Sequence, residues 1–369
     1  MADIERPAPG RTVVLAGGGT GGHVYPALAM GAALQTLGHS LVYLGDARRL
    51  EGRVVPARGI PFHPVPAVQF PRSGLLAKAS FGVGLLRSIM HSRKLLKNVR
   101  ADVVLGVGGY VSAPPVLAAW TLGIPTAVHE ANVTPGLANR LCARVADLVL
   151  LTYEGTRARL KTQGQVELVG CPVNRAILEG DAAAAAQRYG LALDQPTLLI
   201  VGGSLGAETI NTLAVALARD PNRTMQLAVV TGPKYEGRVK EQLGELPPGV
   251  GVIGYEDRMA DAYALASMVL CRAGSSTLAE VTALGLPSIL VPSPNVTDNH
   301  QEGNARGLEA VGAAVVVVER DLDVDDVVAR VRALMADPAA LKQMGEAAQG
   351  LARLDTAERV AGLVDGLLR

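Results

Sequence analysis

At 369 residues the chain is longer than one hydrophobic core usually supports, which predicts two domains. A net charge of +1 and an aromatic content of 3% argue against nucleic-acid binding through bulk charge or base stacking. No apolar run reaches the roughly 18–20 residues of a membrane span, and residues 1–11 lack the apolar core of a secretory signal. Three cysteines without metal-type spacing favour reduced thiols in a cytosolic protein.

The first motif is a glycine-rich loop between a predicted strand and a predicted helix. Val13–Ala16 is a continuous apolar run, typical of a buried parallel strand. Five glycines follow within residues 17–22, and the helix begins at Gly22 with Pro26 near its first turn. Backbone N–H groups at such a helix start form an anion site. His23 adds an ionisable group where substrate oxygens would arrive.

The same loop matches the dinucleotide fingerprint G-x-G-x-x-G through Gly17, Gly19 and Gly22. Asp46 ends the second predicted strand, close to where the ribose-binding acid of a dehydrogenase would stand. Further glycine loops in the second half of the chain argue against this alternative, because one nicotinamide cofactor would not need them.

Strand-like runs alternate with amphipathic segments along the whole chain, which predicts an α/β protein with parallel sheets. The first series is 13–16, 41–44, 103–106, 126–128 and 148–151; the second is 197–201, 226–230, 252–254, 268–271, 288–291 and 314–318. Each series opens with a strand, a glycine turn and a helix. We therefore expect two Rossmann-like domains facing a central cleft, 1–165 and 166–352, with the helix in 353–369 packing back on the first.

Residues 70–99 depart from this pattern, because they mix apolar with basic side chains and contain no acidic residue. Such a stretch can lie on an anionic membrane surface, where each basic residue contributes on the order of 1 kcal/mol. The alternative is an ordinary crossover helix whose lysines and arginines face water.

Polar residues follow two further strands of the first half. The loop Gly106–Pro115 carries Tyr110, and the next strand ends in His129–Asn132, with Asn139 soon after. Ligands of open α/β sheets bind at the carboxyl ends of the strands, so these loops are well placed. For His129 a structural hydrogen bond with Glu130 is the favoured interpretation.

Three polar loops stand out in the second half of the chain. Gly202–Gly206 offers amides and Ser204 at a helix start, with Asn211 either facing the cleft or making a packing contact. Arg272–Glu280 supplies hydroxyls at another helix start, and its Glu280 either accepts ribose hydroxyls or compensates the helix dipole. Asp298–Asn304 is rich in amides that can bind sugar hydroxyls. No spacing here resembles a metal site.

Taken together, these motifs resemble those of the N-acetylglucosaminyltransferases of peptidoglycan synthesis, glycosyltransferase family 28. In chain order they are GGGTGGHVYPA, GVGGYVSAPP, HEAN with Asn139, GGSLGAETIN, RAGSSTLAE and the 301–304 cluster. The resemblance covers nearly the whole chain and implies the GT-B fold. It also implies inverting transfer of N-acetylglucosamine from its UDP donor to the 4-hydroxyl of the muramoyl sugar of undecaprenyl-linked lipid I, giving lipid II.

The resemblance assigns the site residues. It implies donor-binding roles for Thr20, Gly21, Gly22, Asn132, Arg175, Ser204, Glu256 (by its backbone), Ala273, Gly274, Ser275, Ser276, Thr277, Leu278, Glu280 and Gln301. It implies acceptor-binding roles for Gly18, Gly19, Tyr110 and Asn139, and makes His23 the general base. No cofactor and no metal are implied. Three motifs depart from the family pattern: this chain has HEAN for HEQN, GCPVNR for GNPVR and GGYVSAPP for GGYVSGP. As a result, Arg175 stands one position from the expected arginine.

Because the implied acceptor is lipid-borne, the resemblance favours the interpretation that residues 70–99 lie on a membrane surface. It also implies a peripheral protein on the cytoplasmic face of the cell membrane. It leaves other cell-wall enzymes open as partners. The rival interpretations are a family-28 enzyme with another lipid or a natural product as acceptor, a UDP-sugar epimerase, and a protein that only binds nucleotides.

Overall fold

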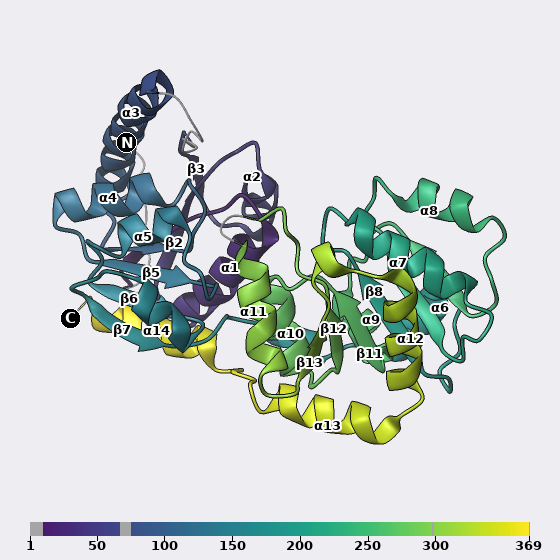
Figure 1. Ribbon diagram of the computed structural model, residues 1–369. Coiled ribbons are helices and arrows are strands. Elements are labelled where there is room, and N and C mark those ends of the chain that lie inside the picture. The colour runs from purple at the N-terminus through teal and green to yellow at the C-terminus, as the bar shows by residue number, and fades with distance from the viewer. Residues whose placement is uncertain (1–9, 67–74, 297–298, 369) are drawn as a thin grey trace. The chain divides into compact units, whose positions relative to one another are not determined.

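The computed structural model describes residues 10–66, 75–296 and 299–368 (Figure 1). The chain forms two compact units. Unit 1 comprises Met1–Val173 and Arg353–Arg369, and unit 2 comprises Asn174–Ala352. Within the described residues, no helix combines the length and apolarity needed to cross a membrane.

Unit 1 is built on a seven-stranded parallel sheet of order β3-β2-β1-β4-β5-β6-β7. Its strands are β1 (Thr12–Ala16), β2 (Ser40–Gly45), β3 (Phe62–Pro64), β4 (Val103–Gly106), β5 (Thr126–Glu130), β6 (Leu148–Leu151) and β7 (Gln165–Leu168). Its helices are α1 (Gly21–Thr36), α2 (Leu50–Val54), α3 (Leu75–Asn98), α4 (Ala113–Leu122), α5 (Leu137–Cys142) and α14 (Thr356–Gly366), with 3₁₀ turns η1 (Pro56–Arg58) and η2 (Glu154–Arg159).

Unit 2 repeats the plan with a six-stranded parallel sheet of order β10-β9-β8-β11-β12-β13. Its strands are β8 (Thr197–Val201), β9 (Gln226–Val230), β10 (Val250–Ile253), β11 (Met268–Cys271), β12 (Ser288–Leu290) and β13 (Ala314–Val316). Its helices are α6 (Ala182–Tyr189), α7 (Glu208–Arg219), α8 (Glu236–Leu243), α9 (Met259–Leu265), α10 (Ser275–Ala283), α11 (His300–Glu309), α12 (Val324–Met335) and α13 (Pro338–Gln349), with 3₁₀ turns η3 (Arg175–Leu178) and η5 (Glu319–Asp321).

The continuous apolar runs form strands because both faces of each sheet are covered. In β1, Val13 and Leu15 pack into the core on one face, while Val14 and Ala16 pack into the core on the other. In β8 the run 197–201 divides between two cores in the same way. Two parallel α/β sheets are therefore confirmed.

Three details differ from the sequence prediction. The edge strands β3 and β7 were not predicted, since they are short and only partly buried. Because β7 pairs with β6, the unit boundary lies at 173/174 rather than at 165/166. Helix α1 begins at Gly21, so Pro26 lies in its second turn, where its missing N–H leaves the carbonyl of Gly22 without its helical partner.

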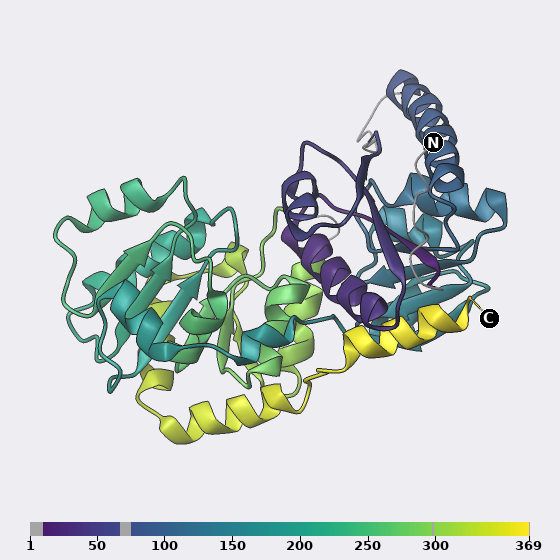
Figure 2. The same cartoon turned by 180° about the vertical axis from the view of Figure 1, so that it is seen from behind.

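The C-terminal helix α14 belongs to unit 1 and packs along α1, as Figure 2 shows in yellow and purple. Val360, Ala361 and Val364 enter the same core as β1. The buried hydroxyl of Thr356 donates to the carbonyl of Val169 at 2.8 Å, which ties the start of α14 to the residues after β7.

Candidate functional site

The glycine loop of unit 1 uses its first three amides within the protein. Gly17 donates its N–H to the carbonyl of Leu44 and Gly18 donates to the carbonyl of Gly108, each at 3.2 Å. Gly19 donates to a carboxylate oxygen of Glu51 at 2.9 Å. Gly18 and Gly19, predicted to bind the acceptor, therefore contribute the shape of the loop rather than available donors.

The backbone amides that remain available to a ligand belong to the next three residues, at the start of α1. No hydrogen bond within the described residues uses the N–H groups of Thr20, Gly21 or Gly22. These are the unpaired donors of a first helical turn, and this turn contains no acidic residue. The geometry therefore narrows the predicted anion site from residues 17–22 to residues 20–22.

His23 follows these amides and lies against the loop after β4. The imidazole covers Gly108, where a Cβ atom would come within 2.9 Å of Cε1 and Nδ1 of His23 and 3.5 Å from Nδ2 of Asn139. Gly108 also has φ +95°, a conformation that side chains rarely allow. Glycine at this position thus brings His23 and Asn139 together at the carboxyl end of the sheet.

The loop after β4 is locked against the glycine loop. A Cβ atom at Gly109 would lie 2.3 Å from the carbonyl oxygen of Gly18, so the two backbones are in contact. The buried hydroxyl of Ser112 donates back to the carbonyl of Gly109 at 2.8 Å. Tyr110, predicted to bind the acceptor, stands at the tip of this loop and is 40% exposed.

Glu130 is the centre of the polar cluster after β5, a role that the sequence prediction missed. Its buried Oε1 accepts from the backbone N–H and the side-chain amide of Asn132, at 2.9 and 3.2 Å. Its Oε2 accepts from Nδ2 of Asn139 at 2.9 Å and from the N–H of Gly136 at 3.2 Å. Burial raises the pKa of the Glu130 carboxyl, although these donors oppose the shift. The predicted ligands Asn132 and Asn139 are thus oriented by one carboxylate.

His129 has a structural role, but its partner is not Glu130. Its Nε2 lies 2.9 Å from the carbonyl oxygen of Gly170, on the segment that leads out of unit 1. Burial lowers the pKa of His129 to about 4, so the ring is neutral at neutral pH.

In unit 2, helix α10 begins with the hydroxyl-rich motif that is predicted from the sequence to hold the nucleotide. Gly274 caps the helix in an extended conformation, and Ser276 and Thr277 are half-buried in its first turn. Ser275 is buried, and its hydroxyl accepts from Nδ2 of Asn304 on α11 at 3.2 Å. The buried neighbours Ala273 and Leu278 pack into the core.

Glu280 lies in the second turn of α10, and the first turn contains no acidic residue, which argues against a role in compensating the helix dipole. The hydroxyl of Tyr263 on α9 donates to its Oε2 at 3.0 Å. Burial raises the pKa of the Glu280 carboxyl to about 7, and the bond from Tyr263 opposes this shift. The site therefore holds a carboxyl group that ionises near neutral pH.

The loop 202–207 stands apart from its helix, because α7 begins only at Glu208. Ser204 is exposed on it, and Gly206 is so close to the next loop that a Cβ atom would lie 2.1 Å from the carbonyl oxygen of Thr231. Asn211 is buried and donates to that same carbonyl at 3.1 Å. Of the two alternatives predicted for Asn211, the packing contact is therefore the one that the structure shows.

Gln301 and Arg175 lie in different surroundings. Oε1 of Gln301, near the start of α11, accepts from the backbone N–H of Ser293 at 2.9 Å, which fixes the side chain beside the loop after β12. Arg175 opens the 3₁₀ turn η3 and is exposed, directly after the boundary between the units. In the described part of the chain, no group of three or more His, Cys, Asp or Glu side chains could hold a metal ion.

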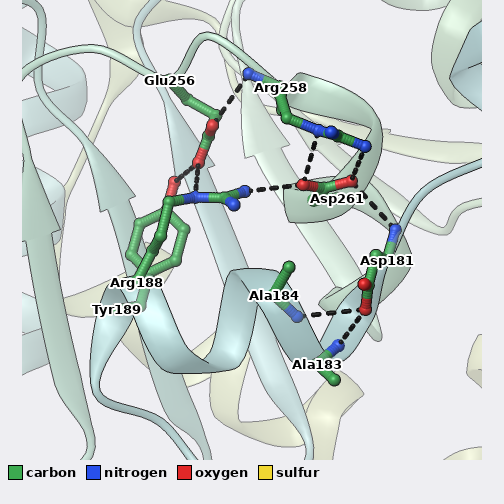
Figure 3. A network of polar contacts seen from close by, with 8 residues as sticks. All are labelled: Asp181, Ala183, Ala184, Arg188, Tyr189, Glu256, Arg258 and Asp261. Carbon is green, nitrogen blue, oxygen red and sulfur yellow. Dashed lines mark hydrogen bonds and ion pairs between the residues drawn. The ribbon is translucent and has the colours of Figure 1, made fainter.

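The side chain of Glu256 belongs to an ionic network in which the carboxylates of Glu256 and Asp261 are buried, shown in Figure 3. It accepts from the hydroxyl of Tyr189 at 3.1 Å, from Nε of Arg188 at 3.3 Å and from the N–H of Arg258 at 2.9 Å. Arg188 also pairs with Asp261 at 3.0 Å, and a hydrogen bond from the backbone of Asp181 is the main cause that lowers the pKa of Asp261. The network holds the loop between β10 and α9, so only the backbone at Glu256 is open to the predicted role.

Comparison with known protein families matches both halves of the chain. Residues 13–151 match the glycosyltransferase family 28 N-terminal domain, and residues 197–360 match the glycosyltransferase family 28 C-terminal domain.

Curated relatives match over nearly the whole chain. A protein of Clavibacter sepedonicus is 42% identical over 361 residues, covering 95% of this chain and 95% of the relative. One of Listeria monocytogenes serotype 4b is 37% identical over 362 residues, covering 97% and 99%. Both are named UDP-N-acetylglucosamine–N-acetylmuramyl-(pentapeptide) pyrophosphoryl-undecaprenol N-acetylglucosamine transferase.

Solved structures agree. Acinetobacter baumannii MurG matches with a TM-score of 0.77 and 27% identity, covering 96% of this chain and 99% of that one. The kitacinnamycin glycotransferase matches with a TM-score of 0.74 at 19% identity, a likeness of fold alone. These likenesses confirm the predicted GT-B fold. The chain belongs to the family of UDP-N-acetylglucosamine–N-acetylmuramyl-(pentapeptide) pyrophosphoryl-undecaprenol N-acetylglucosamine transferases, within glycosyltransferase family 28.

Proposed function

We propose that this chain transfers N-acetylglucosamine from UDP-N-acetylglucosamine to the 4-hydroxyl of the muramoyl sugar of lipid I, with inversion, and so forms lipid II. The observation that carries the proposal is a pair of different half-sites on one chain. Unit 1 has open amides followed by His23, and unit 2 has a hydroxyl-rich helix start followed by Glu280. The names of the relatives supply the two substrates.

Unit 2 would hold the donor. The amides and hydroxyls at the start of α10 suit the diphosphate, because a helix N-terminus favours negative charge. Ser204, exposed on its glycine loop, would add a donor to the same phosphates. Glu280 would accept from the ribose hydroxyls, and Gln301 would contact hydroxyls of the N-acetylglucosamine. Arg175 and the backbone at Glu256 complete the proposed donor set.

Unit 1 would hold the acceptor. The amides of Thr20–Gly22 suit its pyrophosphate and would also line the donor sugar, as the resemblance implies, whereas Gly18 and Gly19 shape the loop. Asn132, which Glu130 orients, would present its amide group to the sugars. Asn139 donates both of its amide N–H bonds within the protein, to Glu130 and to the carbonyl of His129, so it would offer its Oδ1 as an acceptor. The exposed ring of Tyr110 would cover the acceptor from the loop after β4.

The chemistry proposed for His23 is general-base catalysis. Its imidazole would take the proton of the 4-hydroxyl as that oxygen forms its bond to the anomeric carbon. The bond from the anomeric carbon to the diphosphate breaks, and UDP leaves with the electron pair. Amides and hydroxyls at the start of α10 would stabilise the charge that develops on the departing diphosphate.

We further propose that α3 places unit 1 on an anionic membrane surface. Val83, Leu86 and Met90 recur with helical spacing and are 53%, 62% and 58% exposed. Among the basic residues, Arg87 and Lys94 are exposed on the same helix. An apolar stripe with basic neighbours suits the surface of a bilayer that carries a lipid-linked acceptor, which we assign to its cytoplasmic face. Residues 70–74 of the predicted segment lie outside the described residues.

We expect His23→Ala to lower kcat by about 10²–10⁴-fold, because it removes the proposed base. The affinity for UDP should stay unchanged, since UDP binds to unit 2. Initial rates with lipid I and calorimetric titration with UDP measure the two quantities. His63→Ala, in the edge strand β3, is the matched control and should change neither. Near-normal turnover by the His23 variant would rule out this base.

The affinity for UDP should fall about tenfold from pH 8 to pH 6, if only the ionised Glu280 binds the ribose and its pKa is about 7. The sign follows from the charge, since a carboxylate can accept from both hydroxyls and a protonated carboxyl cannot. Calorimetric titrations across this range should show the fall in the native protein, and Glu280→Gln should lack this component. The terminal phosphate of UDP also ionises, and this affects both proteins alike. An equal dependence of UDP affinity on pH in both proteins would therefore contradict the role of Glu280.

Replacing Val83, Leu86 and Met90 together with Ser should weaken flotation with vesicles that contain anionic lipid, because the apolar stripe is lost. The matched control replaces Leu193, Leu246 and Val311, exposed apolar residues of unit 2, with Ser. The control should float as the native protein does. Equal flotation of both triple variants would refute the membrane surface on α3.

A further inference from the structure

A buried glutamate lies directly beneath the glycine loop. Glu51, on the short helix α2, is 0% exposed. Its Oε2 accepts from the N–H of Gly19 at 2.9 Å, and its Oε1 accepts from the N–H of Asp46 at 3.1 Å. A Cβ atom at Gly18 would lie 2.0 Å from Oε1, so the carboxylate occupies the place of a side chain at that position. One side chain therefore joins the loop after β1 to the loop after β2.

The position requires a carboxylate rather than an amide. Both groups that face the two oxygens of Glu51 are N–H donors, and a glutamine would turn its own NH₂ toward one of them. Within the described residues Glu51 makes no ion pair, so these hydrogen bonds are what offsets the burial of its charge. A buried charge held in this way fixes the position of the backbone that it bonds.

The backbone that Glu51 fixes is the one that shapes the acceptor half-site. Gly18 and Gly19 have φ values of +148° and +94°, which an unconstrained loop would not hold uniquely. Because Glu51 takes the N–H of Gly19, the first amides left for an incoming anion are those of residues 20–22. His23 follows in the same turn of α1.

We propose that Glu51 is a positioning residue for acceptor binding and transfer: its carboxylate holds the glycine loop so that the amides of residues 20–22 and the imidazole of His23 keep their reactive arrangement. This inference rests on the proposed function for its kinetic consequence. The loop geometry itself does not depend on that function. Because Glu51 is fully buried, it would act through the loop and not by direct contact with substrate.

The test compares Glu51→Gln with a control that makes the same carboxylate-to-amide change elsewhere in unit 1, away from the glycine loop. Asp147 accepts from the N–H and the hydroxyl of Thr126, at 2.8 and 3.1 Å, at the opposite end of the sheet. Asp147→Asn is therefore the matched control. Hydrogen exchange at residues 17–22, kinetics with lipid I and UDP-N-acetylglucosamine, and UDP affinity are measured for both variants and the native chain.

For Glu51→Gln we expect faster exchange at Gly19 and a loss of about 10–100-fold in kcat/KM for the acceptor, because displacement of a positioned group by about 1 Å can cost 10²-fold. The affinity for UDP should stay within about twofold, since the donor half-site is in unit 2. Asp147→Asn should leave the exchange of the glycine loop and the acceptor kinetics as in the native chain. A general loss of stability would not lower kcat/KM for the acceptor while leaving the affinity for UDP unchanged.

Native exchange at residues 17–22 in Glu51→Gln, or native acceptor kinetics despite faster exchange, would overturn the proposal. Equal kinetic losses in both variants would also overturn it. If the native protein transferred nothing to lipid I, the proposed function would fail, while the exchange measurement would still decide whether Glu51 holds the loop. Should the Gln variant not fold, Glu51→Asp, which keeps the charge but shortens the reach, takes its place with the same readouts and the same deciding outcomes.

Discussion

The contact between the loop after β1 and the loop after β4 is the constraint on which the proposed acceptor half-site depends. Gly18 donates to Gly108 at 3.2 Å, and Gly109 lies so close to the carbonyl of Gly18 that no Cβ atom would fit. Two backbones can approach in this way only where side chains are absent. This approach brings His23, carried by the helix that follows the first loop, against the second loop.

Buried carboxylates that accept backbone N–H groups then set the geometry of two loops in unit 1. Glu51 and Glu130 each receive backbone N–H groups from the loops at the carboxyl end of the sheet. Unit 2 uses another device, since Arg188 and Glu256 form part of an ionic network beneath the loop after β10. In both units the rigid sheet positions the loops, and charged groups behind the loops fix their shape.

The sequence predicted the features that depend on local pattern. Continuous apolar runs such as Val13–Ala16 form strands because both faces are covered. The first glycine loop leads directly into α1, whereas α7 begins only at Glu208, after the loop 202–207. The edge strands β3 and β7 escaped prediction, because a short half-buried strand carries little apolar signal. Hydrogen bonds between distant residues could not be predicted either: Glu51 takes the amide of Gly19 across 32 positions, and His129 pairs with Gly170 rather than with Glu130.

The most direct test of the proposed transfer measures UDP release from UDP-N-acetylglucosamine by the purified chain, with and without lipid I, alongside other UDP-sugars. Release is expected only when lipid I is present. One UDP should appear for each lipid product that has gained an N-acetylglucosamine, with UDP-N-acetylglucosamine the preferred donor. Release that is independent of lipid I, or conversion of the donor into an epimer without transfer, would contradict the proposed transfer.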